Sequence, residues 1–162
     1  MKKTFVIFLG VALVLVLSYQ WYAKGQRRAV DLAAWDAIGR YQREAMSSSP
    51  SNLGERKLDA EKALAAVNAD SPAHQPLMYM LYASDNLSFD ESLTKKAIRN
   101  GSSLSLKDVQ ARSRLDYSVY ETCQSAAIAA IYHQKSARDI SGLQTCKDNY
   151  DRLPSMADTF LK

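Results

Sequence analysis

The first 23 residues contain the feature that most constrains how this chain can fold. After a Met1-Lys2-Lys3 start, residues 4–23 carry no charged side chain, and residues 4–17 are dense in Phe, Val, Ile and Leu. As one helix, these 20 residues would span roughly 30 Å, the thickness of the hydrocarbon core of a bilayer. A buried helix of a soluble protein seldom lacks a polar face altogether. The segment therefore predicts contact with a membrane through residues 4–23.

Aromatic and then basic residues follow the apolar run, in the order that is typical of a membrane surface. These candidate membrane-interface residues are Tyr19, Trp21, Tyr22, Lys24, Arg27 and Arg28. We interpret residues 1–25 as an uncleaved signal-anchor. The alternative is a signal peptide that is removed after Ser18 or Gly25. The cationic start and the apolar run fit both, but neither cleavage site has the usual small-residue pattern.

Two sequence signals disagree about the side of the membrane on which the rest of the chain lies. Counting Lys and Arg on each side of the apolar run slightly favours a cytoplasmic C-terminal domain. The Lys2-Lys3 start is typical of export, however, and Cys123 and Cys146 fit an oxidising compartment. We therefore expect a single-pass protein of a bacterial-type inner membrane with its C-terminal domain in the periplasm. Cleavage would instead release that domain into the periplasm.

The remaining sequence predicts an all-α domain, because glycine, proline and β-branched residues are sparse and no strict alternation is long enough for a strand. We predict helices near 4–46, 52–68, 72–84, 89–99, 105–134 and 137–152, followed by a short final segment. The Ser47-Ser48-Ser49-Pro50 sequence is the clearest linker. The expected organisation is a signal-anchor at 1–25, a juxtamembrane helix and linker at 26–50, and an extracytoplasmic helical domain at 51–162.

Helix starts are indicated by Ser or Asn three residues before an acidic residue, or by Ser before Pro. These signals are Asn52…Glu55, Ser71-Pro72, Ser88…Glu91, Ser105…Asp108 and Ser136…Asp139. Gly101 and Pro154 indicate helix ends. The starts are spaced roughly as in helical-hairpin repeats, but the consensus positions of such repeats do not recur along the chain. We therefore expect an irregular helical-hairpin array after the transmembrane helix.

Cys123 and Cys146 are placed nearly symmetrically about the polar turn at 133–138. In an antiparallel helical hairpin, residues at equal distances from the turn lie opposite each other. Each cysteine also falls on an apolar stripe of its helix, so both should face the core. We predict that a disulfide joins the two helices and contributes roughly 3 kcal/mol. Two buried thiols would be the better interpretation in a cytoplasm.

Catalytic and cofactor signatures are not apparent in the sequence. It has no nucleophile elbow, zinc-protease motif or glycine-rich phosphate loop. The two cysteines and His133 lack the spacing of zinc ligands, so we expect no metal and no cofactor. Apart from Lys2 and Lys3, the chain has 19 basic and 17 acidic side chains. This balance provides no excess of Lys and Arg of the kind that binds nucleic acid.

A protein partner is the remaining expectation. The run at 77–82 is rich in Leu, Met and Tyr, which pack a central helix or form an adaptable binding surface. The candidate partner-binding residues are Trp35, Met78, Tyr79 and Tyr82. We therefore expect a non-enzymatic, membrane-anchored envelope protein whose domain binds or scaffolds another protein. A cleaved, soluble periplasmic inhibitor or immunity-type protein is the alternative, and a small helical hydrolase is a more distant one.

Overall fold

The computed structural model describes residues 2–47, 49–99, 106–133 and 135–160, with side chains described for 7–47, 49–87, 113–133 and 135–154. The helices are α1 (Lys2–Ala45), α2 (Leu53–Ala66), α3 (His74–Arg99), α4 (Leu106–Tyr132) and α5 (Ser141–Phe160), with a short 3-10 turn at Ala137–Asp139 before α5. Over these described ranges the chain has no strand. The prediction of an all-helical protein is confirmed.

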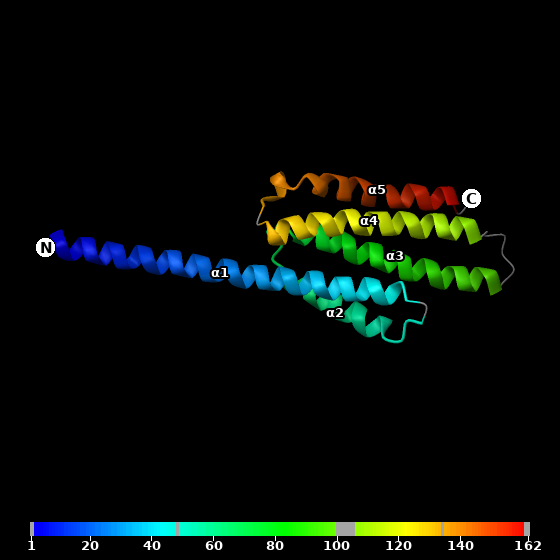
Figure 1. The fold of residues 1–162 in the computed structure, drawn as a ribbon, viewed down its shortest axis with the longest axis horizontal. Coiled ribbons are helices and arrows are strands. Elements are labelled where there is room, and N and C mark those ends of the chain that lie inside the picture. Colours follow the sequence, from blue (N-terminus) through cyan, green and yellow to red (C-terminus); the bar gives the residue numbers. More distant parts are fainter. Residues whose placement is uncertain (1, 48, 100–105, 134, 161–162) are drawn as a thin grey trace.

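The helices run up and down along one axis, and α1 extends far beyond the others at its N-terminal end (Figure 1). Helix α3 is central and contacts all four other helices. Helix α2 packs mainly on α1, and α5 packs mainly on α4. The loops before α3 and after α4 lie at the end of the bundle where α1 departs (Figure 1). We call this end the membrane-proximal end, a name that refers to the membrane anchor proposed below for α1.

The C-terminal half of α1 belongs to the domain. Ala34, Ile38, Tyr41 and Ala45 recur every three or four residues and are all buried, so they form one apolar stripe of the helix. The predicted juxtamembrane helix at 26–50 therefore packs into the domain through these residues. It is one wall of the core, and it continues without a break into the apolar N-terminal segment.

A polar contact joins α1, α2 and α3 beside this core. The Tyr41 hydroxyl donates to Asp85 Oδ1 at 2.7 Å, and Lys57 Nζ lies 2.8 Å from the same oxygen. Tyr41 is buried, so its hydroxyl needs such a partner. The carboxylate thereby fixes the three helices relative to one another, which a purely apolar contact would do less specifically.

Two predicted helix boundaries are wrong. Helix α3 passes through Ser88 without a break, so the two helices predicted at 72–84 and 89–99 are one. The sequence 77–99 contains no glycine or proline, and a Ser inside a helix costs too little to end it. Pro154 lies inside α5, which continues to Phe160, so the proline does not end that helix. Ser105 and Gly101 lie outside the described residues.

The start signals at Asn52 and Ser71 lie within three residues of the observed helix starts but act through different bonds, whereas Ser136 precedes the 3-10 turn and α5 itself begins at Ser141. Helix α2 begins after Asn52, whose side chain forms no capping bond. The Asn52 backbone N–H instead donates to Glu44 Oε1 at 3.1 Å, which ties the linker back to α1. Ser71 Oγ accepts a hydrogen bond from the Ala73 N–H just before α3. Ser136 Oγ donates to the Asp139 carboxylate, and neither side chain makes the backbone N–H bonds of a capping box.

Candidate functional site

The N-terminal half of α1 is an apolar surface that no described residue covers. Every side chain from Ile7 to Tyr22 is exposed, including Phe8 at 76% and Leu15 at 65%. Monomeric soluble proteins rarely expose a contiguous apolar surface of this extent. Among the described helices, α1 is the one that is long and apolar enough to cross a membrane. A signal sequence near the N-terminus meets the same criteria, so the feature fits both the anchor and the cleaved segment considered above.

The predicted interface residues follow this surface along α1. Trp21 is 83% exposed and Tyr19 is 73% exposed, and the Tyr22 hydroxyl accepts a hydrogen bond from Gln26 Nε2 at 3.1 Å. Lys24 and Arg27 are exposed, whereas Arg28 is half-buried against the domain. This placement would suit an aromatic belt followed by basic residues at head-group level, and the role in a membrane stays a prediction.

The membrane-proximal end contains a pocket of about 200 Å³ built from three segments of the chain. Its lining comes from the first turns of α1 after the apolar surface, from the loop before α3, and from the end of α4 with the turn that follows. The charged lining residues are Lys24, Arg27, Arg28, Asp31, Asp70 and Lys135. We call this cavity the membrane-proximal pocket.

Asp31 is held within this pocket by the loop before α3. Its Oδ2 accepts a hydrogen bond from Ser71 Oγ at 2.9 Å. Partial burial raises the pKa of the Asp31 carboxyl, whereas the Ser71 hydrogen bond and nearby His74 act in the opposite direction. The interaction therefore ties α1 to the loop at the level of the pocket.

A Ser, an Asp and a His meet here, but they are not arranged for nucleophilic catalysis. In that arrangement the hydroxyl donates to an imidazole, which takes its proton. The Ser71 hydroxyl instead donates to the Asp31 carboxylate, and the described residues include no hydrogen bond from a hydroxyl to His74. His133, the second histidine of the chain, is exposed beyond the end of α4. No group of three or more potential metal ligands occurs among the described residues.

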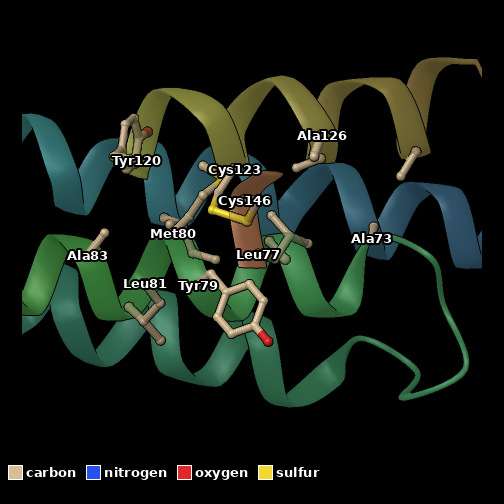
Figure 2. Packing of buried hydrophobic residues seen from close by; sticks show 14 of the residues in the cluster. Ala73, Leu77, Tyr79, Met80, Leu81, Ala83, Tyr120, Cys123, Ala126 and Cys146 are labelled. Carbon is tan, nitrogen blue, oxygen red and sulfur yellow. A yellow bond between two sulfur atoms is a disulfide. The ribbon is translucent and has the colours of Figure 1, made fainter. Parts of the chain in front are cut away.

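The disulfide between Cys123 and Cys146 is present and buried. The S–S distance is 2.05 Å, and the two Cα atoms are 4.9 Å apart, within the range that a disulfide requires. Neither cysteine is exposed to solvent. Figure 2 shows Leu77 and Met80 of α3 beside the sulfur atoms. The stapled hairpin of α4 and α5 therefore packs directly on the central helix, which confirms the predicted pairing.

The residues proposed for partner binding are divided between core and surface. Tyr79 is buried, and its ring stacks on Tyr150 of α5 with the centroids 4.6 Å apart. Tyr82 is 43% exposed, and its ring centroid lies 6.0 Å from that of Tyr150. Met78 is half-buried. We call Tyr79, Tyr82 and Tyr150 the tyrosine cluster. It presents one tyrosine outward, not two, and its role in binding stays a prediction.

Trp35 occupies a different part of the molecule. Its ring is half-buried and meets Tyr132 of α4 edge-to-face, with the centroids 6.2 Å apart. The Trp35 Nε1 atom is enclosed and has no hydrogen-bond partner among the described residues. Tyr132 itself is 46% exposed. Trp35 therefore packs on the domain, and any partner contact in this region would be made chiefly by Tyr132.

The pocket brings together residues that sequence reasoning had left apart. Lys24, Arg27 and Arg28 were singled out for the membrane surface, but Asp31, Ser71 and Lys135 were not connected with them. Polar residues in the loops at 68–72 and 133–138 were the available signal. The up-and-down order of the helices places both loops beside the start of the domain. No protein-family model matches this chain, and no curated protein or solved structure gives a significant match.

Proposed function

We propose that this protein is a single-pass envelope protein whose helical domain is held at the outer surface of a membrane, where it binds another protein. The observation that carries the proposal is the division of α1 into two halves. Residues 7–22 are exposed, uncharged and largely apolar, and one face of residues 34–45 forms part of the core. Burying the first half in hydrocarbon would remove a large apolar area from water, and that transfer is favourable.

The extracytoplasmic location is supported by the cysteine pair. A buried disulfide between helices persists in oxidising compartments and is rare in a reducing cytoplasm. This argument opposes the count of basic residues around the apolar segment, which slightly favours the other orientation. We give the disulfide more weight because it is a property of the folded domain.

A binding role is supported by aromatic side chains on the domain surface. Tyr82, Tyr117 and Tyr132 are each between 38% and 46% exposed. Tyrosine is enriched at protein interfaces because it combines a large apolar ring with a hydroxyl that can form a hydrogen bond. The Tyr82 ring also packs near that of Tyr150, so this side chain would lose less conformational freedom on binding than an isolated surface tyrosine.

The alternative is a soluble periplasmic inhibitor or immunity-type protein. Cleavage after Gly25 would leave the whole core intact, because its first buried residue is Ala34. Gly25 lies within α1, however, and the residues on both sides of it are helical. The uncleaved chain keeps α1 continuous, whereas cleavage after Gly25 would cut through the helix.

Fractionation of cells that produce the full chain tests the anchor. We expect the protein in the membrane fraction at full length, resistant to alkaline extraction, and accessible to protease added outside the membrane. Leu13→Arg places a charge in the middle of the span, where it costs about 2.5–3.5 kcal/mol, and should release the protein. Leu58→Arg is the matched control, because Leu58 is a 48% exposed residue of α2. A soluble chain that begins at Gln26 would refute the anchor.

Site-specific photo-cross-linking tests the partner. A photoreactive residue at position 82 should give a discrete adduct with one protein, whereas the same residue at Lys62, an exposed position of α2, should not. Tyr82→Ala should reduce recovery of that protein in a pull-down with the full-length chain. Equal adducts from both positions, or none from position 82, would count against a specific surface at the tyrosine cluster.

A further inference from the structure

The membrane-proximal pocket carries more positive than negative charge. Four basic side chains line it, from Lys24, Arg27, Arg28 and Lys135, against the two carboxylates of Asp31 and Asp70. The basic residues come from two segments far apart in the sequence, at the start of the domain and beyond the end of α4. They therefore converge on one cavity only in the folded chain. Its lining also includes Pro72 and Ile131, which supply apolar wall.

The two carboxylates offset the basic side chains only in part. None of the four makes an ion pair with another described residue. The Nε atom of Arg28 is enclosed without a hydrogen-bond partner among the described residues. An enclosed donor without an acceptor is costly and is rare in folded proteins unless water or an ion completes it. Asp31, in contrast, already accepts the Ser71 hydroxyl.

The pocket lies at the depth of the lipid head groups if residues 4–23 span the hydrocarbon. Lys24 to Asp31 would then lie between about 1.5 and 12 Å beyond the hydrocarbon edge, at 1.5 Å per residue. The head-group layer on each side of a bilayer is about 5–7 Å thick. The loops that complete the pocket are at the same end of the bundle (Figure 1). A lipid phosphate in the adjacent leaflet is therefore within reach.

We propose that the membrane-proximal pocket binds the phosphate of an anionic phospholipid from this leaflet, with Arg28 and Lys135 as its principal contacts. Arginine offers several donors to phosphate oxygens, and lysine adds a point charge. Basic pockets between transmembrane helices hold anionic head groups on the cytoplasmic or matrix side of membranes, and the same charge complementarity would operate here. The inference rests on the proposed anchor, and it adds a ligand that would fix the rotation of the domain about α1 relative to the bilayer.

Native mass spectrometry of the full-length chain in detergent micelles tests this proposal. Titration with phosphatidylglycerol should show one saturable lipid, and phosphatidylcholine should bind at least about tenfold more weakly because its choline cation opposes the basic lining. Lys135→Gln and Arg28→Gln should each weaken phosphatidylglycerol binding about fivefold. Lys147→Gln, an exposed change on α5, is the matched control and should leave binding unchanged. Because Lys135 is exposed, its variant keeps the test valid even if Arg28→Gln perturbs folding.

Three results would overturn the lipid proposal. These are equal retention of phosphatidylcholine and phosphatidylglycerol, unchanged binding in the Lys135 variant, and displacement of the lipid by an equal concentration of inorganic phosphate, which would make free phosphate the ligand. Failure of the anchor is a separate result. A soluble chain beginning at Gln26 rejects the proposed function whatever its lipid affinity, whereas a membrane-bound chain whose variants bind lipid normally rejects the pocket alone.

Discussion

Removing the disulfide is the most direct perturbation of this fold. We consider the double substitution Cys123→Ala with Cys146→Ala, which leaves both helices intact and introduces no polar group into the core. Both cysteines are fully buried, and their cross-link joins α4 to α5 beside the central helix α3. The change should therefore lower the stability of the whole domain, not of a peripheral segment.

The size of the loss follows from the loop that the bond closes. For a separation of 23 residues, the loop-closure relation gives about 3.4 kcal/mol at 25 °C. The space left by two buried sulfur atoms adds on the order of 1 kcal/mol. A loss near 4 kcal/mol in a domain of this size corresponds to a fall in Tm of about 12–15 °C. Since domains of this kind are stable by about 5–15 kcal/mol, the variant should still fold at room temperature.

Thermal unfolding of the full-length chain in detergent micelles, followed by near-ultraviolet circular dichroism, measures this loss. Reductant should lower the Tm of the wild-type chain and leave that of the double variant unchanged. Val119→Ala is the control, because Val119 is also fully buried in α4 and its truncation costs stability without altering the cross-link. The reasoning is refuted if reductant leaves the wild-type Tm unchanged, or if the unfolded, unreduced chain alkylates at both cysteines.

Three further changes have defined outcomes. Burial raises the pKa of Tyr120 to about 12, so its contribution to stability is present below pH 10 and is lost as pH rises from 10 to 12. Tyr120→Phe should recover about 2–3 kcal/mol of that alkaline loss, and its absorbance titration should lack a phenol that ionises near pH 12. Gly142→Ala should stabilise the protein by about 0.5–1 kcal/mol in urea unfolding, because alanine favours the helix and has less freedom than glycine in the unfolded chain. The added Cβ would lie 3.6 Å from the Ala126 Cβ, which is an ordinary contact. A lower urea midpoint would contradict this prediction. Burial raises the pKa of Asp31, so the contribution of its carboxyl to stability is present at acidic pH and is lost as pH rises. The urea midpoint of Asp31→Asn minus that of the wild type should therefore increase from about pH 4 to pH 7. A difference that stays constant over this range would reject the prediction.

The helical fold and the disulfide could be predicted because both depend on local patterns. Apolar residues every three or four positions place Cys123 and Cys146 on core-facing stripes, and equal distances from one turn bring them together. Helix ends were less predictable. The Ser88 signal resembles a helix start, yet nothing in the preceding residues stops α3, so the helix continues through it. A start signal has structural meaning only where the previous helix has already ended.

The candidate site was only partly predictable for a different reason. The basic residues after the apolar segment are visible in the sequence, and so are the polar turns at 68–72 and 133–138. Their convergence depends on the packing of α1 against α3 and α4, which no local pattern specifies. The tyrosines show the same limit. Tyr79 and Tyr82 are three residues apart, yet packing of Tyr150 against this face of α3 leaves one buried and the other exposed.

The continuity of α1 has a consequence for how the proposed domain could meet a partner. The helix has 44 residues, a length of about 66 Å, and it passes from the apolar surface into the core without a linker. Helix α3 starts at His74 at the membrane-proximal end, so Tyr82 lies only about 12 Å further along the bundle axis. A flexible tether would let the domain reach tens of ångströms into the surrounding space. In the proposed anchored protein, a rigid α1 would keep Tyr82 roughly 24 Å from the hydrocarbon edge, about 12 Å for residues 24–31 and about 12 Å for residues 74–82. A partner that binds Tyr82 would therefore have to approach the membrane surface.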